Sequence, residues 1–138
     1  MANYVCTCRT SYFRVTDEEK YTEMFDRLGG EGAVQDFTEK DEHGDIWHAF
    51  GCYGSIYVED EDGEESPDIS NWFEELSKIV REGDACVYME AGYEKLCYVM
   101  GDLIVAMHGC VEYNSLECMA KNILQKHGFG PDEVRMYY

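Results

Sequence analysis

The segment Ser70–Ala91 reads SNWFEELSKIVREGDACVYMEA and contains both periodicities from which the rest of this 138-residue chain is built. Its first half repeats apolar residues at the spacing of one helix face: Trp72, Phe73, Leu76, Ile79 and Val80. This spacing predicts an amphipathic helix that is capped by Asp68 or Ser70 and ends at Gly83. The second half, Asp84–Ala91, is rich in Val, Tyr and Cys and predicts a strand.

Two more helices are expected on the same grounds. The segment Thr16–Glu19 has the form of a capping box and would open a helix that ends at Gly29–Gly30. The segment Asn114–Glu117 would open another helix, which ends at Gly128. The expected buried stripes are Tyr21, Met24, Phe25 and Leu28 in the first helix and Leu116, Met119, Ala120, Ile123 and Leu124 in the second.

Further strands are expected at Asn3–Val15, Ala33–Glu39, Asp45–Phe50, Ser55–Glu59, Lys95–Met100, Leu103–His108 and Val134–Tyr138. The three strands between Ala33 and Glu59 are expected to form a meander. Gly92–Glu94 and Gly101–Asp102 are turn candidates, and the second could instead be a bulge within one long strand. The sequence therefore predicts one α+β domain, residues 1–138, with an antiparallel sheet of about six or seven strands and three amphipathic helices packed on it.

Negative charge is concentrated in one part of the chain. Fifteen of the 29 acidic residues lie between Glu31 and Glu75 against a single base, Lys40, which gives this stretch a net charge of −14 out of −18. Six of the seven positions of Glu59–Glu65 are acidic. Such crowding costs folding free energy through like-charge repulsion, so we interpret it as serving a partner. A pI near 4.3 argues against direct binding to nucleic acid or to an anionic membrane.

The acidic stretch has three interpretations. It could be a solvated hairpin turn, a calcium loop, or an imitation of a nucleic-acid backbone. The spacing of an EF-hand fails, because placing Gly63 at its sixth position puts Val58 at the first. Under the third interpretation the residues that contact a basic partner are Asp41, Glu42, Asp45, Tyr57, Glu59, Asp60, Glu61, Asp62, Glu64, Glu65, Asp68, Glu74 and Glu75.

Catalytic and metal-binding motifs are weak in this sequence. Cys52, His48 and Asp45 could be combined as a nucleophile, a base and an acid, but no motif specifies those roles. The seven cysteines include no Cys-x-x-Cys pair, and Cys6-x-Cys8 is too short a spacing for a structural zinc site. We therefore expect a non-enzymatic protein without a cofactor or metal.

Cellular location is expected from the cysteines and from the apolar runs. The odd set of cysteines has no regular spacing and follows no signal-like segment, which is typical of a reducing cytoplasm. The longest apolar run, Leu103–Met107, is far too short to span a bilayer. We expect a cytoplasmic protein without membrane contact.

Three segments carry a resemblance: RTSYFRVTDEEKY (Arg9–Tyr21), FGCYGSIY (Phe50–Tyr57) and YMEAGYEKL (Tyr88–Leu96). They resemble small acidic proteins of phages and conjugative elements of Gram-positive bacteria, elements that also encode anti-CRISPR and antirestriction proteins. The resemblance implies an inhibitor of host defence and a location in the bacterial cell. It supplies no binding motif that can be transferred residue by residue.

Charge and resemblance together predict an acidic nucleic-acid mimic that binds the basic channel of a defence nuclease, such as a CRISPR effector or a restriction enzyme. In this mechanism carboxylates pair with the Arg and Lys side chains that otherwise hold phosphates. The alternative is an immunity or antitoxin protein that neutralises a basic toxin. An enzyme with an unrecognised site is a third hypothesis.

Overall fold

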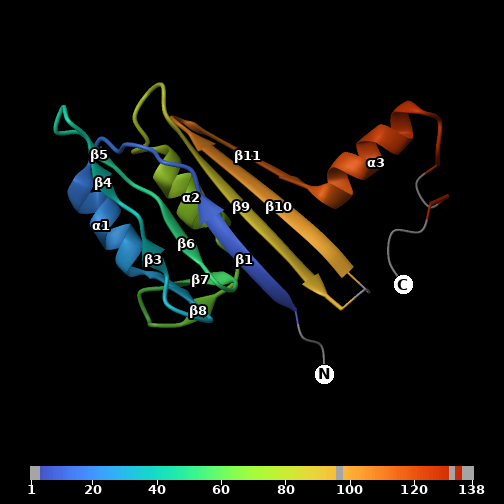
Figure 1. Cartoon of the computed structure of the whole chain (residues 1–138), viewed down its shortest axis with the longest axis horizontal. Helices are drawn as coiled ribbons and strands as arrows, with labels where there is room; N and C mark the ends of the chain where they lie inside the picture. Colours follow the sequence, from blue (N-terminus) through green and yellow to red (C-terminus); the bar gives the residue numbers. More distant parts are fainter. Residues whose placement is uncertain (1–3, 96–97, 131–132, 135–138) are drawn as a thin grey trace.

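The computed structural model describes residues 4–95, 98–130 and 133–134. Its main sheet is antiparallel and has six strands in the order β11-β10-β9-β1-β6-β3 (Figure 1). The helices are α1 (Glu18–Asp26), α2 (Ser70–Ser77) and α3 (Leu116–Lys126). The strands are β1 (Val5–Thr10), β2 (Leu28–Gly30), β3 (Gln35–Asp36), β4 (Glu39–Lys40), β5 (Ile46–Trp47), β6 (Phe50–Cys52), β7 (Ile56–Glu59), β8 (Glu65–Ser66), β9 (Ala85–Glu94), β10 (Tyr98–Met107) and β11 (Cys110–Ser115).

The predicted α+β class and the large antiparallel sheet are confirmed. The sheet holds six strands, and the remaining strands form a three-stranded sheet, β2-β7-β8, and a two-stranded sheet, β4-β5. None of the described helices is both long enough and apolar enough to cross a lipid bilayer.

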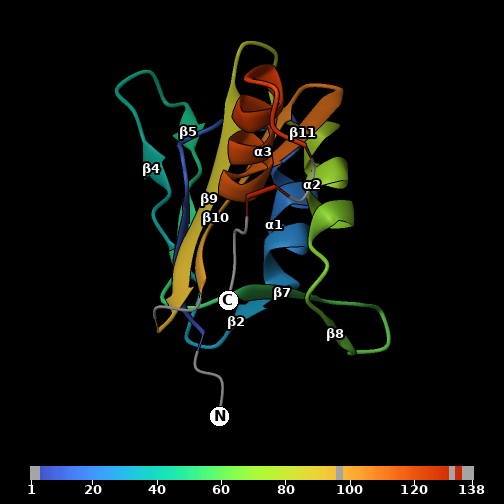
Figure 2. The same cartoon turned by 90° about the vertical axis from the view of Figure 1, so that its right-hand side faces the viewer.

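Two of the helices bury one face of the main sheet. Figure 2 shows α1 and α2 on the same side of it. Helix α2 has Ile69 and not Asp68 or Ser70 at its N-cap, and it ends at Ser77 and not at Gly83. Its predicted stripe packs there all the same, because Trp72, Phe73 and Leu76 are buried, as is Val80 beyond its end. The ring of Trp72 meets Phe50 of β6 edge-on at 5.5 Å, and its Nε1 donates a 2.8 Å hydrogen bond to the Met24 carbonyl of α1. Trp72 thus ties both helices to the sheet.

Helix α1 differs from its prediction at both ends. Asp17, and not Thr16, caps it, with a carboxylate that accepts a 3.0 Å hydrogen bond from the Lys20 amide. The helix ends at Asp26, and Gly29–Gly30, expected to stop it, belong to β2. A Cβ on either glycine would lie 2.5 Å from a side-chain atom of a neighbouring segment, so these glycines permit close packing.

The expected meander between Ala33 and Glu59 is wrong in its third strand. Strand β3 does pair with β6 and β4 with β5, but β7 pairs with β2 and β8 in a separate sheet. The chain leaves the main sheet after Cys52, at Gly54, whose φ of +148° is a conformation that L side chains rarely adopt.

The second half of the main sheet has longer strands than expected. The three strands predicted between Asp84 and His108 are two ten-residue strands, β9 and β10, paired without interruption from Tyr98 to Met107. The alternative of one long strand through Gly101–Asp102 is therefore right, but neither Gly92 nor Gly101 forms a turn or a bulge. A Cβ at these positions would lie 2.5 Å from Tyr4 and 2.9 Å from Leu116, respectively, so side chains pack directly onto the two glycines.

The C-terminal part contains one missed strand and one wrongly placed helix face. Strand β11 was not expected, and the predicted last strand, Val134–Tyr138, lies outside the described residues except for Val134. The predicted stripe of α3 is not buried: Leu116, Met119 and Ile123 are 52%, 47% and 56% exposed. Helix α3 leaves edge strand β11 and stands away from the sheet (Figure 1), so it does not pack on the sheet as α1 and α2 do.

One buried ion pair allows a test of the packing at the end of β9. Asp84, whose side chain is 7% exposed, accepts hydrogen bonds from Arg14 Nε at 2.8 Å, from its Nη2 at 2.9 Å and from its amide at 2.9 Å. The hydrogen bond from the Arg14 side chain is the main reason that the pKa of Asp84 is lowered. A lowered pKa contributes stability above the ordinary Asp value of about 3.9, and this stability is lost as the pH falls through the folded-state value.

We expect Asp84→Asn to lower the free energy of unfolding by about 2 kcal/mol at neutral pH, because the Arg14 guanidinium loses its charged acceptor. The deficit against the wild type should shrink in urea titrations as the pH falls below about 4. Asp45→Asn is the control, since Asp45 meets the same Arg14 at 3.4 Å but is 40% exposed. Equal losses in the two variants, or a deficit that does not depend on pH, would contradict this account.

Candidate functional site

Two acidic loops have the same pattern of backbone and carboxylate hydrogen bonds. Asp41–Asp45 (DEHGD, the Asp41 loop) and Asp60–Glu64 (DEDGE, the Asp60 loop) each join two short strands. In both, the glycine has a positive φ, +86° and +78°, and its amide donates to the carbonyl of the first Asp at 3.1 and 3.0 Å. The first Asp also accepts from the amides two and four residues later, at 2.8 to 2.9 Å. That carboxylate therefore builds the turn in each loop.

The Asp41 loop uses most of its charge inside the fold. The second oxygen of Asp41 accepts a 2.9 Å hydrogen bond from Trp47 Nε1, and this bond is the main reason that the pKa of Asp41 is lowered. Asp45 pairs with Arg14 at 3.4 Å and with Arg81 at 3.7 Å. Of the three residues predicted here to bind a partner, Glu42 alone projects into solvent, 89% exposed.

The acidic hairpin, Glu59–Glu65, differs from the Asp41 loop in the basic partners of its carboxylates. Within the described part of the chain no Lys or Arg nitrogen lies within 4.0 Å of its carboxylates. The charge of Glu65 is the main reason that the pKa of Tyr57 is raised, which places this half-buried tyrosine near the base of the hairpin. No three carboxyl, thiol or imidazole groups among the described residues are arranged to hold a metal ion. The hairpin therefore presents a concentrated negative charge to solvent.

The three predicted acids that follow the hairpin differ in whether they have a partner within the fold. Asp68 accepts from the Ser70 amide at 3.0 Å, and its hydrogen bonds to Ser70 lower its pKa. Glu74 is exposed on α2, and the charges of Glu74 and Asp68 add to burial in raising the pKa of Tyr113, which places both acids near that ring. Glu75 instead pairs at 2.8 Å with Arg27, the residue that follows α1.

The predicted residues do not form one continuous surface. Figures 1 and 2 both show the β4–β5 hairpin and the β7–β8 hairpin at separate corners of the molecule. Helix α1 runs between them (Figure 1). Near its start Glu18 meets His48 at 2.7 Å, and beyond its end the Arg27 carbonyl accepts from the Glu59 amide at 2.8 Å.

An acidic row on α1 extends the hairpin, and it was not among the site residues predicted from the sequence. Glu19, Glu23 and Asp26 are exposed and stand at i, i+4 and i+7, which places them on one helix face opposite the buried Tyr21 and Met24. That spacing is readable in the sequence. The candidate site is therefore the acidic hairpin with Asp68, Glu74 and this acidic row.

The residues considered for catalysis are engaged elsewhere. His48 Nε2 contacts Glu18, and its Nδ1 lies 3.2 Å from Thr38 Oγ1. The Cys52 thiol is buried and donates to the Gly32 carbonyl at 3.8 Å. Asp45 faces Arg14 and Arg81. The structure does not bring these three residues together as an active site.

A further carboxylate pair lies on the main sheet. Glu90 and Asp102 are directly opposite each other on β9 and β10. Burial, together with the charge of Asp102, raises the pKa of Glu90, against the opposing effect of a 3.0 Å hydrogen bond from Tyr88. Like charges directly opposite on neighbouring strands destabilise a sheet. A raised pKa also means that this group favours folding as the pH falls towards the ordinary Glu value.

Glu90→Gln should therefore raise the free energy of unfolding by about 0.5 kcal/mol at neutral pH, because it removes a charge that is disfavoured by its burial and by the repulsion from Asp102. The gain should disappear near pH 4, where Glu90 is protonated in the wild type. Glu112→Gln, on exposed β11, is the control and should change little. Chemical denaturation at the two pH values measures the effect, and a loss of stability at neutral pH would show that the pair is favourable.

Comparisons with known proteins found no relative of this chain. No protein-family model, no curated protein and no solved structure matches the chain.

Proposed function

We propose that this chain is a non-enzymatic inhibitor that occupies the basic nucleic-acid channel of a bacterial defence nuclease. The observation that carries the proposal is the acidic hairpin, whose carboxylates have no Lys or Arg partner within 4.0 Å among the described residues. Neighbouring carboxylates repel one another, and a basic partner relieves that repulsion. The fold leaves this charge available to such a partner.

The arrangement suits a surface that otherwise binds phosphates. Duplex DNA carries one negative charge per about 1.7 Å of its axis, and basic clefts follow that array with Arg and Lys. The acidic hairpin begins beside the end of α1, where the Glu59 amide donates to the Arg27 carbonyl at 2.8 Å, and α1 carries the exposed acidic row. Charge-assisted hydrogen bonds from Arg and Lys to these carboxylates would replace those to phosphate. Competition with nucleic acid follows from this mechanism.

The class of target comes from the resemblance of the Arg9–Tyr21, Phe50–Tyr57 and Tyr88–Leu96 segments to proteins of mobile elements. A CRISPR effector or a restriction enzyme is the basic protein that such an element needs to block. Asp41, Asp45 and Glu75 take no direct part in this proposal, since each already has a partner within the fold.

The test is capture from a bacterial lysate on immobilised protein, with elution by a short DNA duplex or by an uncharged polymer. We expect a nuclease or another nucleic-acid-binding protein to be captured and to be released by DNA alone. A partner that DNA does not displace would contradict mimicry and favour an immunity protein.

A charge variant sharpens this test. Glu61→Gln, Asp62→Asn and Glu64→Gln together remove three charges and keep Asp60 and Gly63, which build the turn. We expect affinity for the captured partner to fall by about tenfold, because the lost charges faced basic groups. The control, with Glu39, Glu82 and Glu112 changed to Gln, has the same net charge. An equal loss in both variants would show that overall charge, and not the hairpin, carries the binding.

A further inference from the structure

Apolar side chains make up much of the face of the main sheet opposite α1 and α2, and several of them are exposed in the described part of the chain. The register of β1, β9 and β10 places Val5, Val87, Met89, Ala91, Tyr93, Val99, Leu103 and Val105 on it, and we call this the open face. Val5, Met89, Tyr93 and Val99 are 49%, 52%, 53% and 68% exposed. A sheet face in contact with water is normally polar, and an apolar patch of this kind marks an interaction surface.

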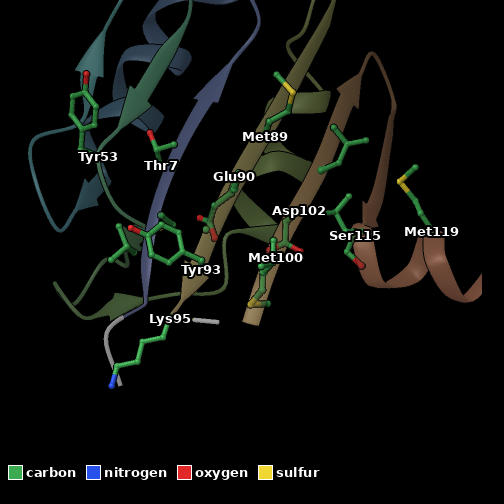
Figure 3. A pocket seen from close by; sticks show the side chains of 18 residues that line it. Thr7, Tyr53, Met89, Glu90, Tyr93, Lys95, Met100, Asp102, Ser115 and Met119 are labelled. Carbon is green, nitrogen blue, oxygen red and sulfur yellow. The ribbon is translucent and has the colours of Figure 1, made fainter. Parts of the chain in front are cut away.

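Helix α3 borders the same surface. A hollow of about 1300 Å³ lies between them, lined by Leu116 and Met119 from the helix and by Met89, Tyr93, Val99 and Leu103 from the sheet (Figure 3). Leu116 packs on Gly101, but Ile123 further along α3 remains 56% exposed. The helix and the open face thus each present an unpaired apolar surface, and the helix does not cover the sheet of its own chain.

Charge distinguishes these two surfaces from the rest of the protein. Residues 1–115 carry a net charge of −18, whereas the 116–130 segment, which holds Glu117, Lys121 and Lys126, carries +1. Among the described residues of β1, β9 and β10, those that point to the open face include no Asp or Glu. Two acidic bodies of this kind repel each other least where their surfaces carry few unpaired carboxylates. On α3 the carboxylate of Glu117 lies 2.8 Å from the Lys121 ammonium, and on the sheet face Glu112 of β11 lies opposite Val105, at the edge of the part that β1, β9 and β10 form. The helix and that part of the open face are therefore the surfaces through which two copies meet with little repulsion.

We propose that the occupant of the open face is a second copy of this chain, in a twofold dimer where α3 of each copy lies on the open face of the other. The apolar stripe of α3 matches the hollow in chemical character, and the net positive charge of its segment suits the acidic body of a partner copy. The same pair of surfaces is used twice, so the arrangement closes at two copies. The acidic hairpin and α1 remain outside the interface, because α1 covers the opposite face of the sheet (Figure 2).

Sedimentation equilibrium of the whole chain tests this proposal. We expect a mass of twice 15.9 kDa at micromolar concentration. Met89→Lys on the open face and Ile123→Glu on α3 should each weaken the dimer by at least about tenfold. Both side chains are already about half exposed, so neither change disturbs the buried core. Ile46→Glu, at an exposed apolar position on β5, is the control and should leave the dimer intact.

Mixing the two weakened variants tests the geometry. In the mixed pair one interface is unaltered, and the other brings the Met89→Lys change of one copy against the Ile123→Glu change of its partner. Because these two introduced charges are opposite, the mixture should recover a dimer that neither variant forms alone. Failure to recover would overturn the placement of α3, and a monomeric wild type at about 100 μM would overturn the dimer.

The effect of salt distinguishes this proposal from the proposed function. Added salt should strengthen the dimer, because it screens the repulsion between the two acidic chains, and it should weaken the complex with a basic partner. Either proposal can therefore be contradicted without the other.

Discussion

The packing of Trp72 against both the sheet and α1 is the contact on which the rest of the structure depends. Its ring meets Phe50 and Phe73 edge-on at 5.5 and 5.0 Å, and its indole nitrogen reaches the last turn of α1 at Met24. Because α1 and α2 are fixed by it on one face, the short hairpins are left at the edges and the other face is left open. The two candidate interaction surfaces, the acidic hairpin and the open face, both follow from the packing of α1 and α2 on one face of the sheet.

The charge of the protein divides into carboxylates that hold the fold and carboxylates that do not. Asp41 closes a turn and binds Trp47, while Asp84 holds Arg14 beside β9. The acidic hairpin has the same hydrogen bonds within its turn as the Asp41 loop, but no arginine pairs with its carboxylates in the described part of the chain. The same local motif therefore forms a loop held by ion pairs in one place and a loop of unpaired negative charge in the other. Net charge alone could not distinguish these roles.

The sequence predicted those features that depend on local periodicity. The stripe of α2 is buried as its spacing indicates, since four of its five members are buried and the fifth, Ile79, packs against the core. Features that depend on distant neighbours were missed. Gly92 and Gly101 resemble turns in the sequence, but they serve the close approach of Tyr4 and Leu116, and these contacts join segments far apart in the chain. The apolar face of α3 was assigned to the core because periodicity reports that one face of a helix is apolar and does not report whether that face is buried.

The candidate site was predicted in composition but not in extent. The hairpin followed from the density of acids in Glu59–Glu65, whereas the separation of Glu42 from it depends on the pairing of β7 with β2, which no local pattern specifies. The acidic row on α1 could have been found from its i, i+4, i+7 spacing. It was overlooked because the density of acids is greater elsewhere.

The most direct measurement of the central claim is the salt dependence of binding to the captured partner, with and without bound DNA on that partner. The account predicts an association constant that falls steeply with salt and is abolished when DNA fills the channel, because carboxylates and phosphates use the same basic groups. An affinity that is insensitive to salt, or a ternary complex with DNA, would contradict it.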